Sequence, residues 1–508
     1  MKKGCYNLVP TQIYNTLMKL EPEQQNFKIP LPSLEGSKEY QEFKSILSRI
    51  DEILVSSGIE NDAKKMAIEM ESSKIDTILL RDDKLRIQKK AARSLRFNIA
   101  LILCGESFRE FSVRLADSYL LQRFCLLDGP NDLRMPSKSK LHRDKKYFSE
   151  LQIRELVNKL LMTGTTQHEQ LSLRENIDLE TILFDSTCVP LNIHHPVDWL
   201  LLRDAARSVI KAVECIRKEG LRNRMSPPKG FTKTMNRLCM EMTHQRDRKT
   251  SKKNRKNILR KMKSHLKVVV SHGKRHRKLL NDKWHKTSLS EKKKDQILNR
   301  LNNILDEIDV ITNQAHERII GERQIKSHEK LLSLYEKEAR VYKRGKAGKD
   351  VEFGLQLGLI ESMNGLIIDW HLHKDQPLND TRYVKMFVDR MEEKFPKQRI
   401  KYFVGDRGCA SKKNDRFLKT NGIKNCLCSR NPKELKEKMK LKYFSSYQNR
   451  RSQTEGRIGI FKNKFLNETL KAKGYSNQLL YVSWAQLAHN LWVLARLPSS
   501  KELEKASA

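Results

Sequence analysis

The sequence is short of acidic residues relative to basic ones, and it lacks the features of membrane-spanning or disulfide-linked proteins. No apolar run approaches the roughly 18 residues of a spanning helix, and no signal peptide precedes the charged start MKKGCYNL. The nine cysteines include no CxxC pair and no matching histidine spacing, which excludes a disulfide framework and a zinc module. We therefore expect a soluble, cytoplasmic protein with reduced thiols.

Basic residues greatly outnumber acidic residues in the sequence. Lys and Arg total 100 against 61 Asp and Glu, and the formal net charge is +39 over 508 residues. Such an excess is typical of a protein that binds a polyanion, and nucleic acid is the first candidate. An anionic membrane surface is the competing polyanion, but the missing apolar segments argue against it. The length allows two to four domains.

Residues 1–176 have the pattern of helices. Apolar residues recur with helical spacing over 43–54 and again over 108–119. Pro136, Ser137 and Ser139 are typical of the start of a further helix. Two such helices joined by a short basic turn form either a helix-turn-helix or an ordinary hairpin, and the basic chain favours the first. We predict an all-α N-terminal DNA-binding domain over residues 1–176.

Residues 244–300 carry 21 Lys or Arg and only four Asp or Glu. Blocks of like charge favour a solvated helix or disorder, and they bind phosphates in a salt-dependent way. A solvated linker is the simpler alternative. We predict that this segment belongs to a basic, mainly helical insertion at about 196–345, which contacts the DNA backbone.

Strand patterns dominate from Val351 onward. Apolar residues alternate over 353–359 and 366–372 with turn residues between them, which predicts a hairpin. A helix over 380–396 and the strands RIKYFVGD and IKNCLC follow. Together with the earlier strand ILFD, this order predicts a ribonuclease-H-like catalytic domain over 177–500. We expect five strands in a mixed sheet with helices on both faces, so that the chain as a whole is α/β.

Three acids can meet in that fold. Asp185 follows Ile182, Leu183 and Phe184 at the expected end of the first strand, and Asp406 ends the fourth. Ligand sites of α/β sheets gather outside strand ends. Glu455 is expected to head a helix that packs on the sheet through an apolar stripe of three residues: Ile458, Phe461 and Phe465. Gly456 and Gly459 weaken that helix by roughly 1 kcal/mol each, which close approach of its backbone to DNA or to the sheet would justify.

The three carboxylates predict a site for two Mg²⁺ or Mn²⁺ ions, because hard cations prefer oxygen ligands and paired ions suit phosphodiester chemistry. Each acid alone has a simpler interpretation: Asp185 and Asp406 as turn residues, Glu455 as a solvated helix residue. The order of the three in a basic chain favours the site. Four other acids remain as substitutes: Asp198, Glu352, Glu361 and Asp369.

Several stretches resemble a known family: FDSTCVPLNIHHPVD, KRGKAGKDVEFG, VGDRG and RSQTEGRIGIFKNK. They are similar to DDE-type insertion-sequence transposases, close to the ISNCY-like group, from about Ser107 to HNLWVLARL near the end of the chain. The spacing of Arg451, Glu455 and Lys462 matches the Tyr-Arg-Glu-Lys signature of related transposases. Gln448 stands at its Tyr position, with Tyr447 beside it.

The resemblance implies binding of terminal inverted repeats, metal-dependent strand cleavage, and attack of the freed 3′-hydroxyl on target DNA, usually in a multimer. Expected partners are therefore double-stranded DNA at the element ends and target, and further copies of the chain on the nucleoid. Two alternatives remain open: a catalytically inactive DNA-binding protein, and an endonuclease of the same fold that never joins strands.

Basic residues close to the acids are the expected DNA contacts. Arg451 and Lys462 share a narrow sector of the helix with Glu455, where they can clamp a phosphate. Arg407 directly follows Asp406. A glycine-interleaved basic loop before Val351 is the second expected contact, and a solvated loop is its simpler interpretation. It comprises Lys343, Arg344, Lys346 and Lys349.

Overall fold

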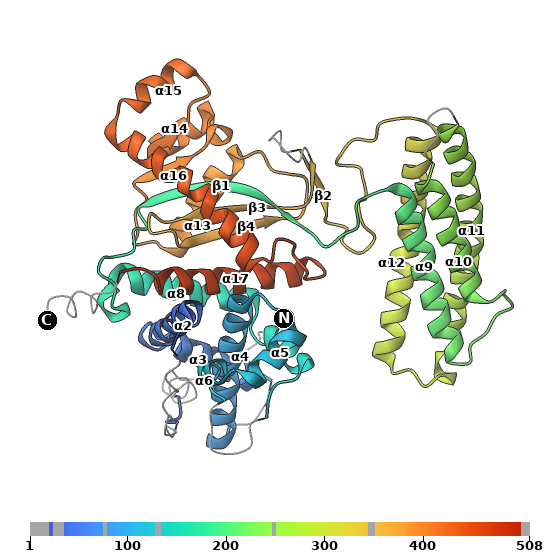
Figure 1. Cartoon of the computed structure of the whole chain (residues 1–508), viewed down its shortest axis with the longest axis horizontal. Helices are drawn as coiled ribbons and strands as arrows, with labels where there is room; N and C mark the ends of the chain where they lie inside the picture. Colours follow the sequence, from blue (N-terminus) through green and yellow to red (C-terminus); the bar gives the residue numbers. More distant parts are fainter. Residues whose placement is uncertain are drawn as a thin grey trace, which may run out of the picture.

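The computed structural model describes residues 20–23, 35–74, 79–127, 134–245, 250–343 and 351–498. A mixed six-stranded sheet lies at the centre, with N-terminal helices below it and a bundle of four helices standing to one side (Figure 1). The predicted α/β class is therefore confirmed. The predicted count of five strands is wrong, because a short strand that follows the bundle adds a sixth.

Helices make up the described elements before the first strand. They are α2 (Lys38–Ser56), α3 (Ile59–Ser72), α4 (Arg81–Cys104), α5 (Phe108–Asp117), α6 (Tyr119–Phe124), α7 (Lys138–Lys145) and α8 (Glu150–Thr166). The apolar stripe of α2 is buried, as its spacing predicts. Ser137 caps α7, but Ser118 breaks the preceding helix and caps α6. Since α6 and a longer connection separate α5 from α7, the expected short turn between two helices is wrong.

The sheet has the order β2-β3-β1-β5-β6, and β4 also pairs with β3. Its strands are β1 (Thr181–Pro190), β2 (Arg340–Lys343), β3 (Val351–Glu361), β4 (Ile367–His373), β5 (Tyr402–Gly405) and β6 (Lys424–Leu427). β3 runs antiparallel to β1, β2 and β4, whereas β5 is parallel to β1 and β6. The predicted hairpin is confirmed as β3 and β4, and Gly365 supplies the positive φ of 85° that its turn requires.

Helices cover both faces of the sheet. Phe184 of β1 packs against Tyr383 and Phe387, with ring centroids 5.2 and 5.7 Å apart. These two rings lie on α13 (Thr381–Lys394), which precedes β5. On the opposite face Leu183 packs with Phe444. Because side chains alternate along a strand, Asp185 shares the face of Leu183, and Ser186 shares the face of Phe184.

Four further helices complete this part of the chain: α14 (Lys412–Thr420), α15 (Pro432–Met439), α16 (Lys442–Ile460) and α17 (Tyr475–Leu494). α17 lies between the sheet and the N-terminal helices, and one continuous apolar core joins all three (Figure 1). The indole of Trp484 donates to the carbonyl of Lys145 at 3.0 Å, and that of Trp370 to Gln486 at 2.9 Å. α17 therefore fixes the N-terminal helices to the hairpin.

The bundle consists of α9 (Asp198–Lys218), α10 (Pro228–Thr243), α11 (Ser251–Lys283) and α12 (Glu291–Ala315). It has an apolar core of its own. The strongly basic segment is largely the long helix α11, in which Leu266 and Val269 are buried while most lysines face solvent. Enough apolar residues thus recur at helical spacing to fold this segment in spite of its charge.

Candidate active site

Asp185 and Asp406 occupy matching positions on neighbouring parallel strands. β1 pairs with β5 through Thr181–Tyr402, Ile182–Phe403 and Leu183–Val404. Continuing this register by two residues brings Asp406 opposite Asp185, and neighbouring strands lie about 4.8 Å apart. Asp185 is not at the end of its strand as expected, because β1 continues to Pro190 and pairs with β3 throughout. The two acids lie at an edge of the sheet because β5, rather than β1, ends there.

Asp406 leaves the sheet where β5 ends, as expected. It is the N-cap of a short 3-10 helix, Arg407–Cys409, and its carboxylate accepts a hydrogen bond from the Cys409 backbone at 3.2 Å. This bond fixes one carboxylate oxygen, so the side chain is held beside the end of β5. The charged group stays half-buried rather than pointing into solvent.

Hydrogen bonds at two points hold α16 over this edge. Gln448 donates to the backbone carbonyls of Cys426 at 2.6 Å and Gly405 at 3.3 Å, at the ends of β6 and β5. Two residues further along, Arg450 donates to the carbonyl of Met363 in the hairpin turn at 2.9 Å. Gln448, which stands at the Tyr position of the signature that this stretch resembles, thus ties α16 to the sheet.

Glu455 lies near the end of α16, so the expectation that it heads a helix is wrong. The preceding residue, Thr454, is buried and donates to the Glu361 carboxylate at 2.6 Å, while Glu455 itself is exposed. A Cβ added to Gly456 or Gly459 would meet nothing within 4 Å. Close approach to the sheet therefore does not explain these glycines.

The apolar stripe of α16 also differs from the expectation. Ile458 is buried, but Phe461 and Phe465 belong to a short π-helix, Phe461–Phe465, that follows α16. Their rings pack against His489 at centroid distances of 5.5 and 5.0 Å. These two side chains therefore secure the end of α16 to α17 rather than to the sheet.

The electrostatics of Asp185 reflect its neighbours. Burial raises its pKa to about 6, opposed by the hydrogen bond from the Ser186 backbone. The negative charges of Asp406 and Glu455 raise it further, while Arg451 lowers it. Within the described residues, Asp185, Asp406 and Glu455 make no ion pair. Asp406 and Glu455 are thus close enough to act on Asp185, and among the described residues no ion-paired side chain neutralises the three acids.

Asp380, just before α13, is a fourth acid that the sequence analysis missed. Ser186 donates to its carboxylate at 2.8 Å from the face of β1 opposite Asp185. Burial and the charge of Asp406 raise the pKa of Asp380. Gly408 separates the two carboxylates, because a Cβ there would lie 2.8 Å from Asp380 Oδ2 and 3.0 Å from Asp406 Oδ1. An aspartate before a helix resembles an ordinary cap, so only the glycine two residues after Asp406 hinted at this crowding.

Cys409 reports the closeness of the three aspartates. Its thiol is fully buried. Burial raises its pKa, and the charges of Asp406, Asp380 and Asp185 raise it in that order of size. The Cys409 thiol is thus close enough to three carboxylates for their charges to raise its pKa: one on β1, one in the loop before α13 and one at the end of β5. We call Asp185, Asp380 and Asp406 the acidic edge.

The four substitute acids have other places. Asp369 is buried among three cations, and Asp198 pairs with Arg318 at 2.7 Å in the bundle. Glu361 accepts hydrogen bonds from Thr454 and Arg450 and thereby anchors α16. Glu352 lies at the other end of β3, opposite Tyr342. Asp185, Asp406 and Glu455 therefore remain the better candidates.

The predicted cationic residues are partly gathered here. Arg451 donates to Gln448 at 3.0 Å and acts on Asp185, and Lys462 donates to Thr187 of β1 at 3.3 Å. Arg407 is exposed beside the acidic edge. Lys343 is the last residue of β2, whereas Arg344, Lys346 and Lys349 lie outside the described residues. Two cations thus follow the face of β1 that carries Asp185.

The donor chemistry suits a hard divalent cation, because it consists of uncompensated carboxylate oxygens. Among the described residues, however, no three His, Cys, Asp or Glu side chains are gathered closely enough to hold a metal ion as they stand. Glu455 is exposed on a helix, so its side chain is free to change rotamer. The residues fit the ion in kind, and Glu455 must turn inward to complete the set.

Comparison with protein-family models, with curated proteins and with solved structures gave no match. None of the helices in the described parts of the chain is long and apolar enough to cross a membrane.

Proposed function

We propose that the chain is a DDE-type DNA transposase that binds the terminal inverted repeats of its element, cleaves a DNA strand and transfers it to target DNA. One observation carries the proposal. The parallel register of β1 and β5 brings Asp185 opposite Asp406, and α16 adds the charge of Glu455 to the same place. Carboxylates brought together without cationic partners are unfavourable unless a ligand neutralises them.

The strand arrangement supports a ribonuclease-H-like catalytic domain. With β2 set aside, five strands remain in the order β4-β3-β1-β5-β6, and β3 alone runs against the other four. α13 and α16 lie on opposite faces of the sheet, against Phe184 and Leu183 of β1 respectively. In this interpretation the bundle is an insertion between β1 and β2, and β2 is the returning strand.

Asp185, Asp406 and Glu455 would hold Mg²⁺ or Mn²⁺. Two bound ions supply an activated attacking oxygen and a stabilised leaving oxygen. The side chains of this chain do the rest. Gln448 and Thr454 fix α16, so that Glu455 stays within reach of β1, and Arg451 and Lys462 offer positive charge to the phosphate along the same strand. A strongly basic chain retains the DNA while the acids act.

The two other functions differ in what they require. A DNA-binding protein without catalysis needs the basic surface and no acidic edge. A nuclease needs the edge but no second DNA. Intact and uncompensated acids favour an enzyme over the first alternative. Joining is proposed from the family resemblance alone, and it must be tested separately from cutting.

The test uses purified protein, Mg²⁺, and labelled DNA ending in the inverted repeats that flank the coding region. We expect Asp185→Asn, Asp406→Asn and Glu455→Gln each to lower strand cleavage by roughly 10³-fold or more, since several kcal/mol of charge stabilisation are lost. DNA retention should stay within about twofold. Glu437→Gln is the control, because Glu437 is exposed on α15 and pairs with Lys440 on the surface.

The outcomes separate the three functions. Cleavage with transfer into a second DNA supports the transposase, and cleavage without transfer supports the nuclease. Retention of DNA without cleavage under Mg²⁺ or Mn²⁺ leaves the non-catalytic protein. Undiminished cleavage by any one acid variant removes that residue from the site.

A further inference from the structure

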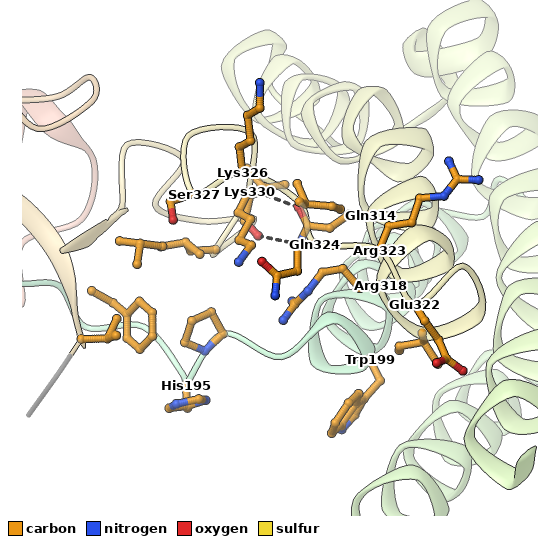
Figure 2. Close-up of a pocket in the computed structure, with 18 of the residues that line it drawn as sticks. His195, Trp199, Gln314, Arg318, Glu322, Arg323, Gln324, Lys326, Ser327 and Lys330 are labelled. Atoms are coloured by element: carbon orange, nitrogen blue, oxygen red, sulfur yellow. Dashed lines mark hydrogen bonds between the residues drawn. The ribbon is translucent and has the colours of Figure 1, made fainter. Parts of the chain in front are cut away.

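A cleft of about 1050 Å³ lies where the bundle meets the edge of the sheet (Figure 2). One wall comes from the segment before α9 and the start of that helix, and another from the start of α11. The end of α12 and the loop that follows it, residues 321–332, close the opposite side, while β2 and β3 contribute apolar residues. The cleft is therefore built by segments far apart in the sequence. It is separate from the acidic edge.

Positive charge dominates the lining. It contains six basic side chains and one acidic one, Glu322. Glu322 is already neutralised by Lys256 at 2.8 Å and Lys252 at 3.3 Å. The remaining basic side chains are Arg255, Arg318, Arg323, Lys326 and Lys330. Arg318 pairs with Asp198 at 2.7 Å and Arg323 with Glu317 at 3.0 Å, so the positive excess is smaller than the count of basic residues but persists. A concave surface with such an excess concentrates anions.

Aromatic side chains lie among these cations. Trp199 lines the cleft at the start of α9, where its indole donates to Thr243 at 3.2 Å. The Arg255 guanidinium lies 5.9 Å from its ring centroid. His195 packs edge-on against Phe353 at a centroid distance of 5.4 Å. Figure 2 shows His195 and Trp199 on one side of the cleft and Arg318 with Gln324 on the other.

The size of the cleft selects among polyanions. Pockets of about 300–1,000 Å³ enclose ligands of drug size, which corresponds to a few nucleotides rather than to the full width of a duplex. Grooves for single strands combine backbone-binding cations with aromatic rings that stack on bases. An acidic peptide would use the cations but would leave the rings without a partner. The observations therefore favour a nucleic-acid strand over a peptide.

We propose that this cleft binds a short single-stranded DNA segment, with its phosphates at the cations of the 318–330 segment and a base against Trp199. The site lies outside the catalytic acids and needs no metal ion. It goes beyond the proposed function, and it stands even if the acidic edge does not cut DNA.

The test is fluorescence anisotropy of a labelled oligothymidine of about eight nucleotides with the full chain in EDTA, at several salt concentrations. We expect Trp199→Ala to weaken binding by roughly 10-fold, because stacking on a base contributes about 1–3 kcal/mol. Trp284→Ala is the matched control, since Trp284 is also half-buried beneath a cation, Lys294 at 4.7 Å. It lies at the other end of α11, about 50 Å away along 33 residues.

A charge pair separates local contact from net charge. We expect Arg323→Glu with Lys326→Glu to weaken binding by at least about 10-fold and to reduce the salt dependence. Lys283→Glu with Lys286→Glu changes net charge equally at the far end of the bundle, and we expect about twofold or less. Circular dichroism checks that each variant is folded, and Trp199→Phe, which keeps a ring, should bind nearly as wild type.

Three results would overturn the proposal. They are equal losses in the cleft and far-end charge variants, unchanged binding in Trp199→Ala, and displacement of the oligonucleotide by duplex DNA or an acidic peptide at lower concentration than by unlabelled single strand. Asp185→Asn should bind the oligonucleotide as wild type does. A failure of cleavage and a failure of this site are therefore distinguishable.

Discussion

Two groups of acids in the same sheet differ in how their charge is balanced. Asp369 on β4 is buried and lies 2.8 Å from nitrogens of Arg154, Arg390 and Lys394. In the acidic edge, the described residues provide hydrogen bonds from Ser186 and Cys409 but no ion pair. Asp369 thus belongs to a complete ion-pair network. Among the described residues, the acids of the acidic edge have no cationic side chain paired with them.

The difference teaches how to separate acids that stabilise the fold from acids that are candidates for a functional site. Burial alone does not do so, because Asp369 is more buried than Asp185. In a chain with a net charge of +39, cationic partners are plentiful. An edge where several acids meet and none is paired must therefore be maintained by the backbone, through the strand register and the end of β5. Such an arrangement is suited to attract a cation.

The largest expected effect tests this contrast through stability. Asp369→Asn should lower the free energy of unfolding by about 3–5 kcal/mol, because three partly buried cations lose the buried carboxylate that they share. Asp185→Asn should leave it unchanged or raise it, because a repelled charge is removed. Hydrogen exchange of β1 and β4 in increasing urea measures both. Equal destabilisation by the two variants would show that the ion-paired Asp369 and the unpaired Asp185 contribute alike to stability.

A smaller effect is expected at Asp380. Asp380→Asn should lower cleavage by roughly 10- to 100-fold, less than the variants of Asp185 or Asp406, because Asp380 meets β1 on the face opposite Asp185. The fold should persist, since Asn can still accept from Ser186. Asp389→Asn is the control on the same helix, where the exposed Asp389 pairs with Lys385. Cleavage at the wild-type rate would assign Asp380 a purely structural place beside β1.

Stability of the metal-free protein should depend on pH through Asp185. Its pKa is raised from 3.8 to about 6, so the folded chain holds this proton more tightly than the unfolded chain. Stability from this group is therefore present below pH 4 and is lost as pH rises through 6. We expect about 1–2 kcal/mol, because solvent screens the partly exposed carboxyl. Urea midpoints across this range should lose that slope in Asp185→Asn, and a slope that persists would exclude Asp185 as its source.

The smallest effect concerns the helix that carries Glu455. Gly456→Ala should stabilise the protein by up to about 1 kcal/mol, since its Cβ meets nothing and alanine favours helix. Gly408→Ala is the comparison, because its Cβ would crowd Asp380 and Asp406 and should destabilise the fold. Thermal melting measures both. If Gly456→Ala weakens DNA binding while raising the melting temperature, the glycine serves close approach of DNA.

Local patterns in the sequence predicted much of the sheet and of the helix that packs on it. The hairpin, α13 and the strand before Asp406 were all predicted, because apolar alternation and helical spacing are local properties of a chain. The sequence analysis missed β2, because its four residues follow a long insertion and are too few to show an alternating apolar pattern. The length of β1 was underestimated because Asp185, Ser186 and Thr187 look like a turn. Pairing with β3 keeps them in a strand.

Residue types and order by themselves determined the positive charge, the α/β class, and the choice of Asp185, Asp406 and Glu455. Only the tertiary structure decided that Asp380 joins them, that Asp369 and Glu361 are structural, and that Trp199 lies in a basic cleft. The physical reason is that neutralisation of a charge depends on neighbours distant in sequence. Arg154 reaches Asp369 across 215 residues, and Thr454 reaches Glu361 across 93.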